Sequence, residues 1–287
     1  MFIIASTMQK NFHNHATLEM LKNIPDMTWN PSIPQRFTGM SEESLKRMLI
    51  PYPKYSHIKK TNLIGNAPES FNWQHEAPEC MVVRDQGQCG SCWAFSAVGS
   101  FSDNRCINKV DERHVMYSEQ FMVSCDQNNH GCESAQLSLD QQFLQKTGVP
   151  TNKCVSYKSG TTGQAGKCPT TCDDKTPIVL YKSTGFEDIC TSEESIKVGL
   201  QRGTVQAGFT VYTDFMYYTG GIYQHKTGDI IGHHAVIIVG YGEQNGVKFW
   251  NIRNSFNTYW GEYGYFRMVR GTNDCDIEDQ CYLTSVE

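Results

Sequence analysis

The residues best able to do chemistry in this sequence are a cysteine, a histidine, an asparagine and a glutamine. Cys92 lies in the run QGQCGSCWA (86–94), His234 in GHHAV (232–236) and Asn254 in NSF (254–256). A thiol titrates near 8.5, and the first turn of a helix and a nearby imidazolium both favour its thiolate. We therefore predict Cys92 as a nucleophile, His234 as its acid–base partner and Asn254 as the group that orients the imidazole. Gln86 would donate to an oxyanion.

Two alternatives compete with this interpretation. Cys89 and Cys92 form a C-x-x-C pattern, which also serves thioredoxin-like redox pairs and zinc sites. A redox pair would follow a short strand in a small βαβ domain, whereas this chain is far longer and Trp93-Ala94-Phe95 has no role in that chemistry. A lone histidine is more often structural than catalytic. The adjacent His233 could also take the role assigned to His234.

These runs, together with WGEYGY (260–265), resemble the papain-like cysteine proteases. The resemblance is closest to the cathepsin B-like branch and also includes SDNRCI (102–107), VYTDF (211–215) and GIYQHKTG (221–228). It implies an α+β, two-lobe fold with the Cys92 helix in a helical lobe, an antiparallel β-barrel-like second lobe and an active site in the cleft. It also implies a cysteine endopeptidase, a hydrolase that works through an acyl-enzyme and is made as an inactive precursor. It favours His234 over His233, because Ala235 follows it directly.

The resemblance implies partners, disulfides and binding residues as well. The partners are protein and peptide substrates, the chain's own prosegment as inhibitor and cystatin-like inhibitors; no cofactor or metal is implied. Substrate contacts are expected from Gly90, Ser134, Ala135, Gly208, His233, Ala235, Phe256, Trp260 and Gln280. The implied disulfides are Cys80–Cys106, Cys89–Cys132, Cys125–Cys168 and Cys154–Cys172. Cys190, Cys275 and Cys281 remain; three cannot all pair within the chain, and Cys190–Cys281 is one option.

The sequence departs from the cathepsin B pattern at four places. The interval 155–171 has no histidine where that branch has a loop with two histidines that bind a substrate's C-terminal carboxylate, so we expect an open cleft and an endopeptidase. The alternatives are a dipeptidyl carboxypeptidase and a non-catalytic papain-like binding protein. Phe256 stands where the family usually has Trp, and Ala135 where it has Gly. Gln280 replaces a Glu that accepts Arg, which favours medium apolar side chains two residues before the cut.

The positioning elements follow from local patterns. Residues 1–66 lack cysteine and are expected to form a prosegment, with a short helix around Leu18 and Leu21, a proline-rich break after Trp29, and a second helix capped by Ser41. We expect a mainly helical lobe over 67–185, with helices at 91–107 and 134–145. A mainly β lobe is expected over 186–287, with strands at 205–212, 235–241, 248–253 and 263–269.

Composition narrows the class of protein. The chain has 287 residues, a net charge of −5 and scattered Lys and Arg, so we expect neither nucleic acid nor an anionic membrane as a partner. No apolar run reaches the length of a membrane span. The apolar tip at residues 1–6 is too short for the core of a secretory signal, so we expect either that the given sequence begins downstream of a signal or that its first residue was chosen for another reason. Twelve cysteines indicate disulfides, and hence a lysosome-like vacuole or secretion.

Overall fold

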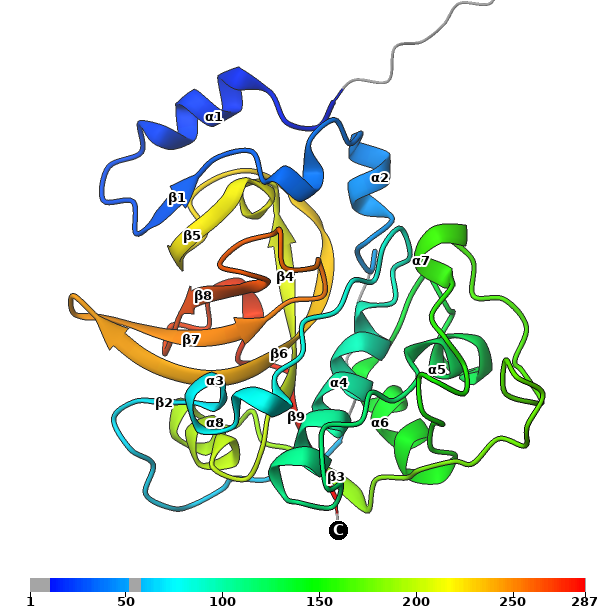
Figure 1. Ribbon diagram of the computed structural model, residues 1–287. Helices are drawn as coiled ribbons and strands as arrows, with labels where there is room; N and C mark the ends of the chain where they lie inside the picture. Colours follow the sequence, from blue (N-terminus) through cyan, green and yellow to red (C-terminus); the bar gives the residue numbers. More distant parts are fainter. Residues whose placement is uncertain (1–10, 52–57, 287) are drawn as a thin grey trace, which may run out of the picture.

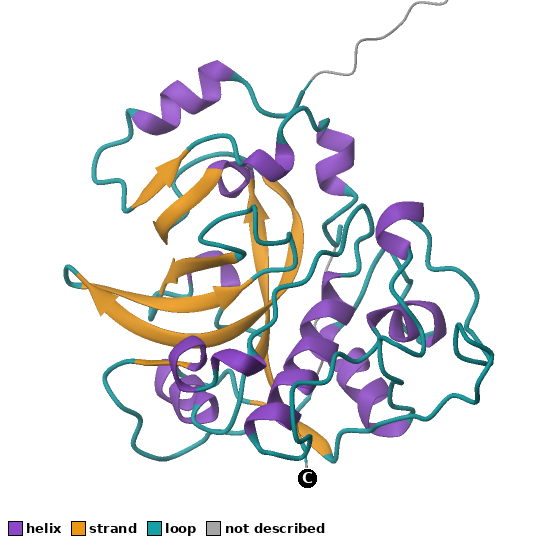
Figure 2. Cartoon of the chain, viewed as in Figure 1, coloured by secondary structure: helices purple, strands orange, loops and turns teal. Residues whose placement is uncertain are grey.

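The computed structural model describes residues 11–51 and 58–286. The apolar tip predicted at residues 1–6 lies outside them. Figure 1 shows a helical lobe beside a sheet lobe, with the N-terminal elements lying over the sheet lobe and reaching the boundary between the lobes, and Figure 2 shows helices and strands segregated in the same way. The predicted α+β, papain-like two-lobe fold is confirmed.

Helix α4 (Cys92–Ile107) is the central element of the helical lobe. Nearly every side chain of α4 is buried, which small residues such as Ala94, Ser96 and Ala97 permit from all sides. It packs against α5 (Glu119–Cys125), α6 (Leu137–Lys146) and the sheet lobe. A single turn, α7 (Ser159–Thr162), completes this lobe. The predicted helices at 91–107 and 134–145 correspond to α4 and α6.

The sheet lobe is built on one nine-stranded sheet. Its path runs β1-β5-β8-β7-β6-β4-β9-β3, and β2 (Phe71–Asn72) pairs with β6 off this path. The strands on the path are β1 (Trp29–Pro31), β3 (Gly185–Asp188), β4 (Val205–Tyr212), β5 (Tyr218–Tyr223), β6 (Ile230–Gln244), β7 (Val247–Arg253), β8 (Tyr265–Val269) and β9 (Cys281–Ser285). The remaining short elements are α3 (Trp73–Glu76), η2 (Pro78–Cys80), α8 (Glu193–Leu200), η3 (Thr213–Tyr217) and η4 (Asp274–Asp276).

The sheet lobe, expected to be antiparallel and barrel-like, departs from a closed antiparallel barrel in two details. The path of paired strands does not close into a barrel over the residues that the structure describes, because its two ends are the different strands β1 and β3. The pair β5–β8 is parallel, with Ile222 opposite Arg267. The long hairpin β6–β7 lies between these two strands in sequence, so they need not run in opposite directions as hairpin neighbours do.

The N-terminal segment, defined here as residues 11–51, covers the sheet lobe and then enters the region between the lobes. Its elements are α1 (His15–Lys22), β1, η1 (Gln35–Phe37) and α2 (Glu42–Lys46). Trp29 is buried, and its ring centroid lies 5.3 Å from that of Tyr223. Ser41 caps α2 by accepting a hydrogen bond from the Ser44 N–H. The buried apolar side of α2 leads directly into the stretch Met48–Ile50.

Candidate active site

Cys92 is the first residue of α4 and has no exposed surface. At that position it lies beside the unpaired N–H groups of the first helical turn, which favour a negative charge. The backbone of Ala235 on β6 hydrogen-bonds to the thiol and favours its ionised form. Because Ala235 follows His234, this contact brings the thiol of one lobe next to the histidine strand of the other.

His234 and Asn254 form the second part of the site. The imidazole Nε2 lies 2.7 Å from Asn254 Oδ1, and both side chains are buried. An amide oxygen only accepts, so Nε2 carries the proton, and Nδ1, which has no hydrogen-bond partner, is the basic nitrogen. Phe256 stacks on the imidazole, with ring centroids 4.6 Å apart, and shields the bond from water.

His233 takes a different place from His234, as strand alternation requires. Its Nδ1 lies 3.3 Å from the Thr210 hydroxyl, and it lines the neighbouring pocket. Of the two candidate histidines, the structure brings His234, and not His233, to Asn254.

Burial sets the charge state of this covered site. It raises the pKa of Cys92 to about 12, with smaller opposing effects from backbone hydrogen bonds, so the thiol stays protonated. Burial also lowers the pKa of His234 to about 4, against the hydrogen bond to Asn254, so the imidazole stays neutral. The thiolate that the sequence predicted is therefore disfavoured while the site is covered.

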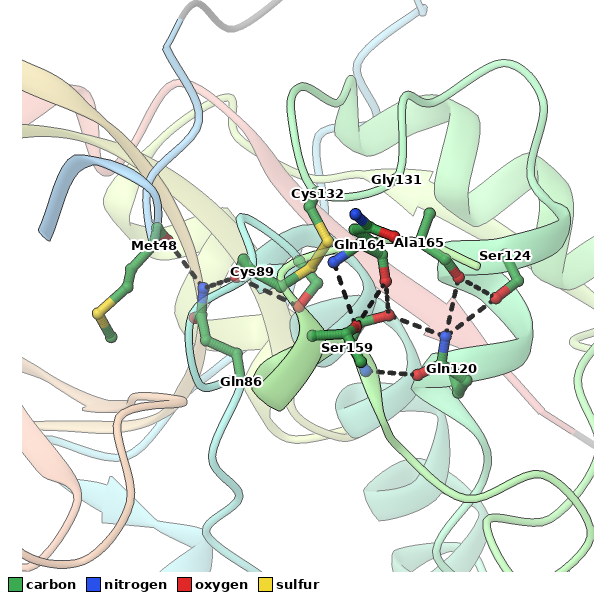
Figure 3. Close-up of a disulfide and its surroundings, with 12 residues drawn as sticks. Met48, Gln86, Cys89, Gln120, Ser124, Gly131, Cys132, Ser159, Gln164 and Ala165 are labelled. Carbon is green, nitrogen blue, oxygen red and sulfur yellow. Dashed lines mark hydrogen bonds between the residues drawn. A yellow bond between two sulfur atoms is a disulfide. The ribbon is translucent and has the colours of Figure 1, made fainter. Parts of the chain in front are cut away.

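Gln86 is fully buried, and a backbone carbonyl of the N-terminal segment already accepts a hydrogen bond from its side-chain amide. Its Nε2 donates to Met48 O and to Cys89 O, both at 2.8 Å, as Figure 3 shows. Its Oε1 accepts from the Ser255 hydroxyl at 2.6 Å, which fixes the orientation of the amide. The N-terminal segment thus places a carbonyl oxygen where the sequence predicted an oxyanion.

The same segment runs on beside the β lobe. Ile50 exchanges both backbone hydrogen bonds with His233, at 2.8 and 2.7 Å. A β-carbon at Gly90 would lie 3.0 Å from Leu49 O and 2.5 Å from Cys132 O, so only glycine allows this close approach.

Five of the predicted binding residues line one pocket with about 390 Å³ of empty space, part of it open to solvent. They are Ala135, Gly208, His233, Ala235 and Gln280, and Ile50 also reaches it. Ser134 does not line this pocket. Trp260 is fully buried and packs edge to face against Phe256, so it holds the ring that stacks on His234.

The interval 155–171 is a short, tightly held connection. Gln120 accepts from the N–H groups of Lys158 and Ser159 and donates to Ser159 Oγ and Ala165 O, as Figure 3 shows in part. Tyr157 donates to Gln86 O at 2.8 Å and lies 2.7 Å from Ser91 Oγ. Sequence analysis missed Gln120 and Tyr157, because neither belongs to a motif with chemistry of its own.

Five disulfides are present, and they are the pairs that the resemblance implied together with the optional one. They join Cys80 to Cys106, Cys89 to Cys132, Cys125 to Cys168, Cys154 to Cys172 and Cys190 to Cys281. Cys92 and Cys275 are free and buried.

A buried cysteine at a helix start, a histidine–asparagine pair across the lobe boundary and this two-lobe architecture define a papain-like protein. Residues 67–285 match the family described as papain family cysteine protease. The chain belongs to the papain family of cysteine proteases, which are hydrolases.

Within that family, the relatives are cathepsin B-like. The chain is 43% identical to "Cathepsin B-like CP3" of Giardia intestinalis over 92% of both chains. It is 32% identical to "Cathepsin B-like cysteine proteinase 4" of Caenorhabditis elegans, over 89% of this chain and 88% of that one. Its structure is similar to "proCathepsin B S9 from Trypanosoma congolense", with a TM-score of 0.89, 26% identity and coverage of 97% and 99%.

Proposed function

We propose that the protein is a cysteine endopeptidase precursor in which Cys92 attacks peptide bonds once the N-terminal segment has left. The observation that carries this proposal is the hydrogen bond between Asn254 and His234, because His234 lies on the strand whose next residue, Ala235, contacts the Cys92 thiol. The family places the chain among cysteine proteases, and the residue roles below are our inference from the geometry.

The reaction begins when the thiol proton passes to Nδ1 of His234, giving a thiolate–imidazolium pair. The sulfur forms a bond to the scissile carbonyl carbon, and the oxygen becomes an oxyanion held by Gln86 and the Cys92 N–H. The C–N bond then breaks, the imidazolium gives its proton to the leaving amine, and a thioester remains. Water, losing a proton to His234, attacks the thioester and releases the acid and the thiol.

The N-terminal segment is proposed as the inhibitor. Met48 O holds the Gln86 amide, Leu49 O lies against Gly90, and Ile50 pairs with the strand of His233. A substrate needs these same donors and acceptors, so it binds only after the segment leaves. The similarity to a procathepsin B over 99% of that chain agrees with a zymogen. A cut in the exposed stretch 64–66, near Asn66, would separate the segment from the protease.

Cleavage within chains, and not release of dipeptides, is the favoured specificity. In the cathepsin B pattern, dipeptide release depends on a loop whose two histidines capture a C-terminal carboxylate beyond the cut. The interval 155–171 contains no histidine, and its backbone is tied down by Gln120.

The disulfides and the cathepsin-like relatives favour the secretory route, leading to a lysosome-like vacuole or to secretion. Within residues 11–51 and 58–286, no helix has the length and apolar character to cross a membrane.

Two matched peptides test the specificity after acid processing. Both carry the same internal site close to the C-terminus, and one ends in a free carboxylate and the other in an amide. An endopeptidase cleaves both at similar rates. Cleavage that requires the free carboxylate would contradict the endopeptidase assignment and favour the dipeptidyl alternative.

A further inference from the structure

A carboxylate outside the family motifs enters the candidate substrate pocket. Asp276, at the end of η4, lines the pocket together with Gly208, Ala235 and Gln280. Sequence analysis assigned the polar character of this pocket to Gln280 alone.

The backbone that carries Asp276 is held in an unusual shape. Asn273, Cys275 and Asp276 have φ values of 50°, 53° and 63°, in the left-handed region that non-glycine residues rarely adopt. The Glu278 carboxylate fixes this turn by accepting from the N–H groups of Gly271 and Asn273. Such conformations persist where the surrounding structure enforces them, and here the result is a carboxylate at the pocket.

Asp276 has an orienting partner and no counter-ion. The Thr210 hydroxyl donates to its Oδ2 at 2.7 Å. Among the residues that the structure describes, no Lys or Arg forms an ion pair with it. Its side chain is only partly buried, so its remaining acceptor sites face the pocket and solvent.

The surroundings of Asp276 are also acidic. Asp274 belongs to the same turn, and Asp214 on η3 lies nearby, paired with His225. Burial together with Cys275, Asp276, Asp274 and Asp214 raises the pKa of Tyr212. One basic group is close by: His233, whose Nδ1 lies 3.3 Å from the same Thr210 hydroxyl.

The present occupant of the pocket supplies no charge. Ile50 of the N-terminal segment reaches the pocket with an apolar side chain, which offers Asp276 no counter-ion in the covered form. A β-carbon at Gly208 would lie 3.0 Å from Leu137 Cδ1, so glycine keeps this side of the pocket wide.

We propose that Asp276 is a specificity-determining residue that makes the pocket accept a cationic side chain, Lys or Arg, two residues before the cut. The inference rests on the proposed function, because it needs a cleaved peptide in the site. A substrate cation would supply the counter-ion that the protein itself does not, and Gln280 would leave room for it without competing charge.

The test compares two peptides that differ only in having Arg or Leu at that residue, using acid-processed enzyme. The readout is the ratio of the two kcat/KM values on the same sample, which cancels differences in the fraction of folded enzyme. We expect Asp276→Asn to lower the Arg-to-Leu ratio about tenfold or more. Asp279→Asn, which removes an equal charge three residues away and outside the pocket lining, is the matched control and should leave the ratio within about twofold.

Three results would overturn the inference. Equal ratios for wild type and Asp276→Asn, or a wild type that cleaves the Leu peptide and barely cleaves the Arg peptide, would refute it and leave the protease intact. A wild type that cleaves neither peptide would refute the proposed function, and this inference with it.

Discussion

Removal of the N-terminal segment should greatly increase the reactivity of Cys92 toward an alkylating agent. Burial holds its pKa at about 12, so at pH 7 about one thiol in 10⁵ is ionised. A solvated cysteine titrates near 8.5, which gives about 3% thiolate at the same pH. Exposure alone should therefore raise the labelling rate by about three orders of magnitude, and pairing with His234 should raise it further.

The assay is iodoacetamide labelling of the intact and the acid-processed chain, followed by intact mass, between pH 5 and 8. In the intact chain the rate should rise about tenfold per pH unit, because only the thiolate reacts. In the processed chain it should be nearly flat, because the thiolate–imidazolium pair is already formed. Simple blockage by the segment would lower the rate equally at every pH, so the slope separates ionisation from access.

Cys275 is the internal control, because burial and nearby carboxylates raise its pKa, and it is unrelated to the N-terminal segment's contacts with Gln86. It should stay unlabelled in both forms. Intact and processed chains with the same labelling rate at Cys92 and the same pH slope would refute the account of the covered site.

Three further predictions concern the site and its cover. Phe256→Ala should lower kcat/KM about tenfold or more by letting water reach the bond from His234, while Phe256→Trp should retain most activity; equal losses would contradict the shielding role. Trp29→Ala should weaken docking of the N-terminal segment by roughly 3–5 kcal/mol, so the intact variant should show peptidase activity at neutral pH, and a silent variant would contradict this. Docking of the N-terminal segment disfavours protonation of His13, because burial lowers its pKa and its Nδ1 has no hydrogen-bond partner. Docking should therefore be strongest above about pH 6.5 and weaken as the pH falls below it, and His13→Gln should flatten the dependence of activation rate on pH; an unchanged profile would exclude His13 as a trigger.

The surroundings of His13 make that last prediction specific. Its Nε2 lies 2.8 Å from Met216 O, and the rings of Phe12, Phe37 and Tyr217 surround it. None of these described neighbours is an acid that could compensate a proton on Nδ1.

Local patterns predicted the elements that carry the strongest periodicity. The predicted strand 205–212 coincides with β4, and the Cys92 helix is one residue shorter than expected. The helices α5 and α8 were missed, because they are short and their sequences, EQFMVSC and EESIKVGL, show too few turns for a period to emerge. The parallel β5–β8 pair depends on contacts between distant segments, which local sequence does not encode.

In the site, too, local motifs predicted some features, whereas features that depend on contacts distant in sequence were not predicted. The runs around Cys92, His234 and Asn254 indicated which residues meet, because these motifs are specific. The protonation of Cys92 in the covered form could not be predicted, because it depends on burial in a core that also contains Ile50, far away in sequence. Asp276 was not predicted as a site residue, because a left-handed turn places it at the pocket and the sequence around it contains no recognisable motif.

The most direct test of the central claim is peptide hydrolysis by three acid-processed proteins: wild type, Cys92→Ala and Cys275→Ala. These variants each remove one of the two free thiols among the described residues. The account predicts that internal cleavage disappears in Cys92→Ala and persists in Cys275→Ala, with mass confirming that each sample has lost its N-terminal segment. Cleavage that survives in a fully processed Cys92→Ala chain would contradict it.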